Sequence, residues 1–435
     1  MGGSSPTEKS AGPLTTAAAE AACRNLTAAA CYAPQQIRVA YGIQSLLDRG
    51  TDGRGETVVL LEFAQQPQQS KPDEPVPVTD IRQDLTLFDA VFDLPAAILQ
   101  IDTSLAGSAS PWLASGEEVE DVEIVHTVAP DAAIRVTLIP RQSSPGSWIA
   151  AADAVLRLAL SHGAVVSIGD GIGNEDCVTS AEVAALNSAL QVAQAHHVTV
   201  VSSTGDLGAA GLVCSGTGPP VKAVGLPAAD PLVLAVGGTN LDADRATGAY
   251  ISESAWNTPA GGPVTASSSG VSSPAGPPGG IPEASGGGFS HLFSQPTYQD
   301  GVPGIEADRG VPDVAADADP ATGMTLAISE GAGKDVFYSA SGTSAAGPLW
   351  AALIALADQY AGRHLGFVNP AIYRIGRSAS YHQAFHDITT GTNTVTFPRA
   401  TISGYQAAPD WDPVTGWGSP NAQALIPLLA SYTGP

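Results

Sequence analysis

The chain has 435 residues, 44% of them hydrophobic, and a formal net charge of -24 at pH 7. A chain of this length can bury a large core and form one α/β domain. It has no basic stripe to bind nucleic acid and no apolar run long enough to span a membrane, so neither is an expected partner. Its many acids and few lysines suit work in acid, where protonation reduces the excess negative charge.

Residues 1–33 form a polar, alanine-rich stretch, and we expect them to be an N-terminal extension of one large domain spanning 34–435. Met1 to Ser5 resembles a start added for expression, and no signal peptide is recognisable. Four cysteines lack the spacing of zinc ligands. Pairing Cys23 with Cys31 and Cys177 with Cys214 is the simplest of three connectivities, and it suits an oxidising compartment.

Apolar, β-branched runs alternate with helix-like runs through the first half of the chain. This alternation predicts an α/β fold with a mostly parallel central sheet and helices on both faces. A Gly-, Ser- and Pro-rich stretch at 258–288 predicts a surface loop. The expected strands are Thr57–Phe63, Ile134–Ile139, Ala164–Ile168, Val198–Ser202 and Leu232–Val236, and the expected helices are Trp148–Leu160 and Ser180–His196.

The acidic segment from Gly116 to Pro130 predicts a helix. Glu117 and Asp121 share one stripe of it with buried aliphatic residues, whereas Glu120 and Glu123 fall on the side that we expect to face water. Two adjacent buried carboxyls cannot both ionise easily, so such a pair can share a proton and act as a base and its orienting partner. The simpler interpretation is a solvated acidic helix.

The segment from Gly342 to Pro348 lies between a strand-like stretch and an apolar run, Leu349 to Leu356, that predicts a buried helix. Ser344 would then stand on a strand-to-helix turn, where the helix N-terminus favours an alkoxide or oxyanion. Pro348 fits a first helical turn. The alternative is an ordinary serine N-cap. None of the eight histidines precedes Gly-Thr, and they look like surface or helix-end residues, so a base for Ser344 should be a carboxylate.

Asp206 follows the expected strand at Val198–Ser202 within the segment Ser203-Thr204-Gly205-Asp206. Open α/β sheets place their sites at the carboxyl ends of strands, so Asp206 is a candidate site residue. A turn aspartate beside glycine is the commoner fate of such a residue.

Several motifs occur in one order along the chain: Glu117-x-x-x-Asp121 with Ala129-Pro130 downstream, Ser203-x-Gly-Asp206, and Ser341-Gly-Thr-Ser344-Ala-x-x-Pro348. In this order they resemble the sedolisin family of serine-carboxyl peptidases. Further matching segments include Ala235 to Thr239, Gly286 to Ser290 and Arg309 to Val314. The resemblance covers about Tyr32 to Leu429 and implies a subtilisin-like fold and activity in acid.

The resemblance also implies roles for individual residues. Ser344 would be the nucleophile, Glu117 the general base and acid, Asp121 the residue that orients Glu117, and Asp206 the oxyanion donor. Because a carboxylate cannot donate a hydrogen bond, Asp206 would have to be protonated to act. Glu62 matches a glutamate that some members carry behind the site. Two departures stand out: Asp170 lies where several members have an aromatic residue, and Glu120 replaces the leucine usual before the aspartate.

A segment at 385–418 resembles the calcium site of the family and implies one structural Ca²⁺ ion, which prefers oxygen ligands. Its ligands would be the side chains of Asp387 and Asp412 and the carbonyls of Ile388, Ala408 and Asp410. Members commonly have glycine at the last two carbonyl positions, which this chain lacks. The alternative is two aspartate-rich turns without metal.

The overall expectation is a secreted, monomeric serine-type endopeptidase acting on peptides or proteins. The family also implies a long inhibitory propeptide in the precursor, which this chain lacks. The alternative functions are a non-catalytic member or a tripeptide-releasing member of the same scaffold.

Overall fold

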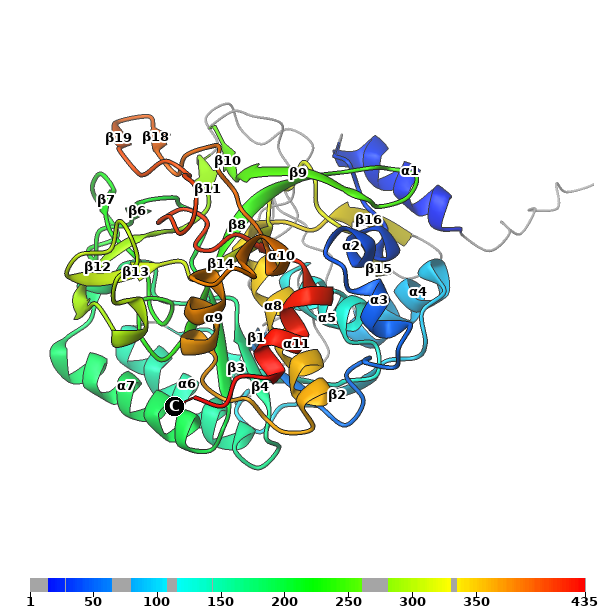
Figure 1. The fold of residues 1–435 in the computed structure, drawn as a ribbon, viewed down its shortest axis with the longest axis horizontal. Helices are drawn as coiled ribbons and strands as arrows, with labels where there is room; N and C mark the ends of the chain where they lie inside the picture. The colour runs from blue at the N-terminus through cyan, green and yellow to red at the C-terminus, as the bar shows by residue number, and fades with distance from the viewer. Residues whose placement is uncertain are drawn as a thin grey trace, which may run out of the picture.

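A computed structural model describes residues 15–27, 29–64, 80–107, 116–142, 144–259, 281–329 and 335–434. Within these residues the central sheet has eight strands in the order β14-β8-β5-β4-β1-β3-β2, with β9 paired to β8 (Figure 1). Every pair is parallel except β8 with β9, which confirms the expected mostly parallel α/β sheet. The strands are β1 (Thr57–Ala64), β2 (Ile98–Asp102), β3 (Ala133–Pro140), β4 (Val165–Ile168), β5 (Thr199–Ser203), β8 (Leu234–Ala243), β9 (Tyr250–Ala255) and β14 (Val314–Asp317).

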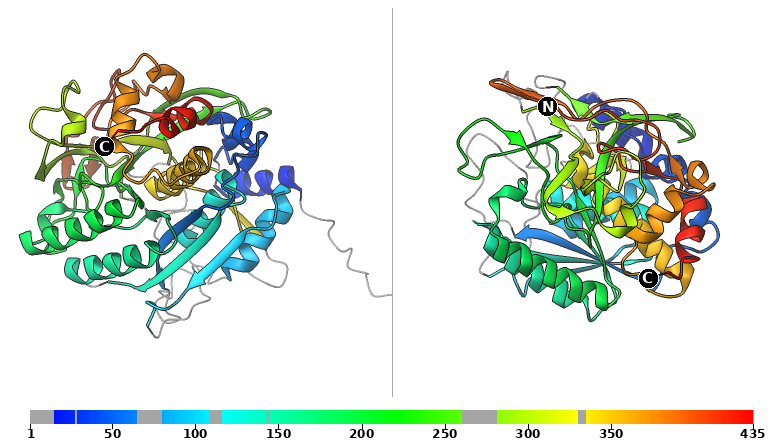
Figure 2. Two further views of the ribbon diagram at one scale, coloured as in Figure 1. Left: turned by 60° about the horizontal axis from the view of Figure 1, so that its bottom comes forward. Right: turned by 60° about the vertical axis from the view of Figure 1, so that its left-hand side comes forward.

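Helices cover both faces of this sheet (Figure 2). Alternate residues of β1 show why: Val58 and Leu60 belong to one hydrophobic core, and Val59 and Leu61 belong to another. A buried parallel strand must present apolar side chains to both faces, which explains the continuous apolar run in its sequence. The first core includes α5 (Gly116–Val128) and α8 (Gly342–Ala361), and the second includes α6 (Pro145–Ala159) and α7 (Ser180–Ala195).

The described part of the expected N-terminal extension packs on the main core. Helix α1 (Thr16–Thr27) buries Ala19 and Cys23 in the same cluster that contains the residues of α8. Thr16 Oγ1 donates to the Val91 carbonyl at 2.9 Å. The packed domain therefore begins at least as early as α1, before the boundary at residue 34 that the sequence suggested. Small alanine side chains give α1 little apolar signal in the sequence.

Both expected disulfides are present, joining Cys23 to Cys31 and Cys177 to Cys214. The ends of the expected 258–288 loop form a short antiparallel pair between β10 (Asn257–Thr258) and β11 (Glu283–Ala284). Its stretch 260–280 lies outside the described residues.

Shorter elements surround the sheet and its helices. They are α2 (Pro34–Ala40), α3 (Gln44–Leu47), α4 (Ile81–Phe92), η1 (Glu175–Cys177), β6 (Ala210–Gly211), β7 (Val221–Lys222), β12 (Gly288–Ser294), η2 (Thr297–Gln299), β13 (Asp308–Val311), β15 (Thr325–Ser329), β16 (Asp335–Ser339), α9 (Asn369–Gly376), α10 (Tyr381–Ala384), β17 (Phe385–His386), β18 (Val395–Phe397), β19 (Ala400–Ile402), β20 (Ser419–Pro420) and α11 (Ala422–Ala430).

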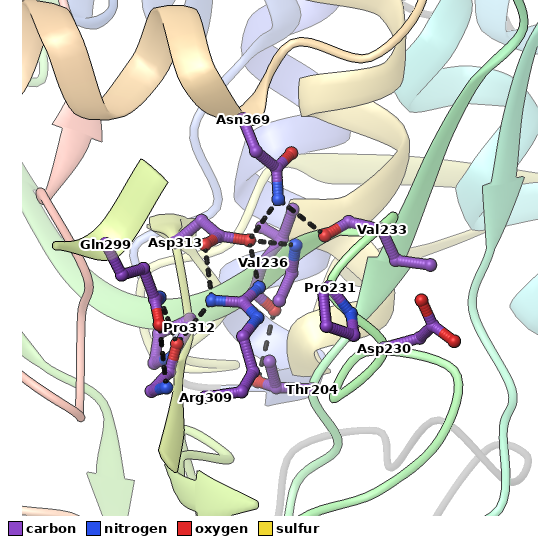
Figure 3. Close-up of polar contacts among 12 residues, drawn as sticks. Thr204, Asp230, Pro231, Val233, Val236, Gln299, Arg309, Pro312, Asp313 and Asn369 are labelled. Carbon is purple, nitrogen blue, oxygen red and sulfur yellow. Dashed lines mark hydrogen bonds and ion pairs between the residues drawn. The ribbon is translucent and has the colours of Figure 1, made fainter. Parts of the chain in front are cut away.

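A fully buried ion pair between Arg309 and Asp313 fixes the start of β14 (Figure 3). Arg309 donates through Nη1 and Nη2 to the two carboxylate oxygens of Asp313 at 2.7 and 2.6 Å. Asp313 Oδ2 also accepts from the backbone N–H of Ala235 in β8 at 2.8 Å, and Asn369 points its amide at the same carboxylate. A buried ion pair needs such a bidentate geometry with further hydrogen bonds to the carboxylate.

Candidate active site

Ser344 lies in the first turn of α8, immediately after a tight turn from β16. Gly342 begins the helix with φ +79°, a left-handed conformation that favours glycine. Ser344 is 4% exposed, and its place near the helix N-terminus favours negative charge on its oxygen. Pro348 is inside the helix rather than in its first turn, because α8 begins at Gly342. Lacking an N–H, Pro348 leaves the Ser344 carbonyl without its helical donor.

Glu117, Asp121 and Ser344 converge beside Gly169, the residue that follows β4. A Cβ atom placed on Gly169 would lie 3.2 Å from Glu117 Oε1, 3.7 Å from Asp121 Oδ2 and 3.9 Å from Ser344 Oγ. Three separate segments therefore meet at one point: the first turns of α5, the carboxyl end of β4 and the N-terminus of α8. The structure brings the three expected triad residues together.

The carboxyls of Glu117 and Asp121 are buried, at 9% and 0% exposed. Burial raises the pKa of Glu117 well above its ordinary value, and the nearby charge of Asp170 raises it further. Burial also raises the pKa of Asp121, reinforced by the charge of Glu117. Neither carboxyl makes a well-aligned hydrogen bond within the described residues, yet Ser344 lies close enough to lower the pKa of Glu117. Long or poorly aligned contacts are common in sites without substrate.

Two further carboxyls stand near this pair. Glu62 is buried in β1, and its burial, followed by the charge of Asp121, raises its pKa well above the ordinary value. Asp170 follows Gly169 and is exposed to solvent. Crowding by protein atoms raises the pKa of Asp170, while the positive charge of Arg141 lowers it. The site therefore holds several acids around one buried pair, with Asp170 at its solvent side.

Asp206 lies beyond the carboxyl end of β5 and contacts the turn that carries Ser344. The backbone N–H and the hydroxyl of Thr343 both donate to Asp206 Oδ1, each at 2.8 Å. Gly205 in turn donates its N–H to Thr343 Oγ1 at 3.0 Å. Because Oδ1 accepts both bonds, a proton on this carboxyl would sit on Oδ2, which would lie 2.8 Å from a Cβ atom on Gly342. Asp206 is thus adjacent to the turn that carries Ser344.

Comparison with known proteins shows the family to which the chain belongs. Residues 105–369, which include Glu117, Asp121, Asp206 and Ser344, match the profile of the Subtilase family. The chain belongs to the subtilase family. Within the subtilases it is a member of the sedolisin group, as the motifs implied.

Three relatives illustrate this membership. Kumamolisin from Bacillus sp. (strain MN-32) is 33% identical over 407 residues, which cover 91% of this chain and 64% of kumamolisin. Tripeptidyl-peptidase 1 from Homo sapiens is 28% identical over 291 residues, which cover 62% of this chain and 44% of that protein. The structure of Pseudomonas sedolisin, a serine-carboxyl proteinase complexed with pseudo-iodotyrostatin, superimposes with a TM-score of 0.70 at 25% identity and covers 92% of this chain and 98% of that chain. The chain thus spans less than two-thirds of the length of both curated relatives.

The acid-rich helix α5 of this chain differs from expectation on its supposedly polar side. Glu120 and Glu123 are 5% and 0% exposed rather than in water. Ser341 donates its backbone N–H to Glu120 Oε1 at 3.0 Å, and Ala327 donates to Glu123 Oε2 at 3.0 Å. Burial raises the pKa of both carboxyls well above the ordinary value. Helical periodicity in the sequence predicts one buried face of a helix. Because neighbouring elements cover α5 on all sides, periodicity could not predict that its second face is buried too.

One histidine also departs from the surface interpretation. His126, in the last turn of α5, is fully buried. Its Nε2 lies 3.0 Å from Asp89 Oδ1 and 2.8 Å from the Pro95 carbonyl. Its ring nitrogen is therefore engaged with α4 and the loop after it, which leaves the carboxyl pair as the groups beside Ser344.

Four of the expected calcium ligands lie in two close pairs in the C-terminal segment. Asp410 N lies 3.4 Å from Asp387 Oδ2, and Ala408 N donates to Asp412 Oδ2 at 3.2 Å. Asp387 Oδ1 is buried without a hydrogen-bond partner, which suits a cation ligand. Asp412 instead uses both oxygens within its own turn. The described residues contain no group of three acidic, His or Cys side chains placed to hold a metal, so carbonyls such as that of Ile388 would have to complete the set.

None of the helices within the described residues has the length and apolar character needed to cross a bilayer.

Proposed function

We propose that the chain is an acid-acting serine-carboxyl endopeptidase that cleaves peptide bonds through a Ser344 acyl-enzyme. The observation that carries the proposal is the convergence of Glu117 Oε1, Asp121 Oδ2 and Ser344 Oγ around Gly169. Relatives named kumamolisin, sedolisin and tripeptidyl-peptidase support the same class of chemistry.

In the acylation step, Ser344 Oγ forms a bond to the substrate carbonyl carbon and transfers its proton to Glu117. Asp121 orients Glu117 and shares a proton with it, as two adjacent buried carboxyls must. Collapse of the tetrahedral intermediate breaks the C–N bond, and Glu117 returns the proton to the leaving amine. Water then attacks the acyl carbon and gives a proton to Glu117. Collapse of this second tetrahedral intermediate breaks the bond between that carbon and Ser344 Oγ, Glu117 returns the proton to Oγ, and the acid product leaves.

Asp206 would stabilise the negative oxygen of the tetrahedral intermediate through a hydrogen bond. An ionised carboxylate has no proton to donate, so this role requires the protonated form. The contacts of Asp206 Oδ1 with Thr343 support it, because they fix the carboxyl beside the turn that carries Ser344. Activity is therefore expected to fall as the pH rises towards neutrality.

A pH profile with a matched nucleophile variant tests the proposal. We expect kcat/KM for a mixed peptide library to peak between about pH 3 and 5 and to vanish in Ser344→Ala. Mass analysis of the products separates internal cleavage from release of tripeptides, which is the alternative that tripeptidyl-peptidase 1 suggests. A profile that peaks near pH 7 to 8 would contradict the carboxylate mechanism.

We further propose that one structural Ca²⁺ ion binds in the C-terminal segment. Asp387 and Asp412 would supply carboxylate oxygens, and Ile388, Ala408 and Asp410 would supply carbonyls, which are the hard ligands that Ca²⁺ prefers. The buried, unpartnered Asp387 Oδ1 supports this set. When bound, the ion would hold the two turns together without entering the reaction.

The two disulfides and the peptidase family together support an oxidising environment outside the cytosol. We propose secretion on this basis, and a monomeric state and a propeptide in the precursor on the resemblance to the sedolisin family.

A further inference from the structure

The backbone leading to Ser344 is held at every residue of its turn. Three successive amides donate to fixed acceptors: Ser341 N to Glu120 Oε1 at 3.0 Å, Gly342 N to the Ala318 carbonyl at 2.8 Å, and Thr343 N to Asp206 Oδ1 at 2.8 Å. Two of these acceptors follow strands β5 and β14 of the sheet, whereas the first is a side chain of helix α5. The turn is therefore positioned jointly by the sheet and by α5.

Glu120 lies one helical turn after Glu117 on the same helix. One rigid element thus carries the proposed base and an acceptor for the turn that presents the nucleophile. We infer that Glu120 is a positioning residue that sets the distance between Glu117 and Ser344 by holding the Ser341 amide. This inference rests on the proposed function of the site.

Loss of the hydrogen bond between the Ser341 amide and Glu120 should lower the catalytic rate. Glu120 is 5% exposed, so without it the Ser341 amide would lose its acceptor in a place where water cannot easily replace it. The turn would then shift towards another acceptor and carry Ser344 with it. A misplacement of about 1 Å in an active site can cost on the order of 100-fold in rate.

Glutamine is the conservative replacement at this position. Burial, with the nearby charge of Asp206, raises the pKa of Glu120, so the neutral acid is the form present at acid pH. Its other acidic neighbours, Glu117, Asp121 and Glu123, are also buried acids with raised pKa values. A neutral carboxyl and a glutamine amide both offer one carbonyl oxygen and one donor, so Gln can accept the Ser341 N–H in the same way.

Glu123 provides a matched control. It lies on the same helix, is fully buried, and accepts one backbone N–H, from Ala327 of β15, at the same 3.0 Å. Replacing either residue by leucine removes one buried hydrogen-bond acceptor, and the two lost hydrogen bonds have the same length. Of these two glutamates, Glu120 alone contacts the turn that carries Ser344.

The experiment measures kcat, KM and thermal midpoint at the acid optimum for wild type, Glu120→Leu, Glu120→Gln, Glu123→Leu and Ser344→Ala. We expect both leucine variants to lose similar stability, but only Glu120→Leu to lose about 10- to 100-fold in kcat with KM little changed. Glu120→Gln should recover kcat to within a few-fold of wild type. Equal kcat losses in the two leucine variants, or Glu120→Gln as slow as Glu120→Leu, would overturn the inference.

Two further measurements keep the result decisive. If Glu120→Leu does not fold, Glu120→Asp replaces it: a shorter carboxyl should lose kcat where Gln keeps it, and equal activity of the two contradicts positioning. Hydrogen exchange at the Ser341 amide should be slower in wild type than in the bond-deleting variant. Wild type without acid peptidase activity would refute the proposed function, while the exchange rates would still decide whether Glu120 holds the turn.

Discussion

Replacing Gly169 by alanine tests the geometry of the triad most directly. The added methyl would lie 3.2 Å from Glu117 Oε1, which is closer than a methyl and a carboxylate oxygen normally approach, so the carboxyl would move by a few tenths of an ångström. Since a shift of about 1 Å can cost roughly 100-fold, a shift of this size should lower kcat by about 3- to 10-fold. The distances to Asp121 Oδ2 and Ser344 Oγ, 3.7 and 3.9 Å, are ordinary contacts, so Glu117 should bear most of the effect.

Gly173 supplies the control, because a Cβ atom placed there meets nothing within 4 Å. We expect Gly173→Ala to keep the wild-type kcat and Gly169→Ala to lose it, with both proteins showing the same far-ultraviolet circular dichroism. The assay is single-turnover acylation by a peptide ester at the acid optimum, which reports the step in which Glu117 acts. If Gly169→Ala acylates as fast as wild type, the three atoms do not meet beside Gly169 in the working enzyme.

Four further predictions concern pH and metal. Burial raises the pKa values of Glu117 and Glu123 in the folded protein above their values in the unfolded chain. Their contribution to the free energy of unfolding is therefore complete below about pH 4 and is lost as the pH rises through the folded pKa values. A urea midpoint that rises towards pH 7 would contradict this. Asp206→Ala should lose about 100- to 1000-fold in kcat, whereas Asp206→Asn should retain more activity and less need for acid; similar kcat for Ala and wild type would make Asp206 a turn residue. Asp170→Asn should lower the pKa of Glu117 and move the acidic limb of the kcat profile to lower pH, and an unmoved limb would remove Asp170 from the site's electrostatics. Removing calcium with EDTA should lower the thermal midpoint and Asp387→Ala should abolish that response; an unchanged midpoint in wild type argues against the ion.

The sequence was sufficient to predict elements whose pattern is local or uniformly apolar. The strands at Thr57, Val165 and Thr199 were found within one or two residues, because a parallel strand buried on both faces is an uninterrupted apolar run. Glu117 and Asp121 were paired correctly because residues four apart share a helix face, and that face does point at Ser344.

The same local patterns could not predict burial by elements that are distant in the sequence. Glu120 and Glu123 look solvated in a helical projection, but β15 and the turn before α8 cover them and supply backbone donors. His126 is buried for a similar reason, since α4 and the loop after it close over the end of α5. The start of α8 was also predicted too late, because Pro348 was placed in the first helical turn, whereas the helix begins at Gly342.

The order in which the triad residues occur along the chain has a consequence for biosynthesis. Glu117 and Asp121 emerge from the ribosome early, whereas Ser344 and the helix that carries it are made only after all seven parallel strands of the sheet have been synthesised. Contacts between such distant segments form late, because a long loop must close before they can stabilise anything. A nascent or truncated chain that ends before α8 therefore lacks Ser344, and under the proposed function peptidase activity would arise only once nearly the whole domain had been assembled.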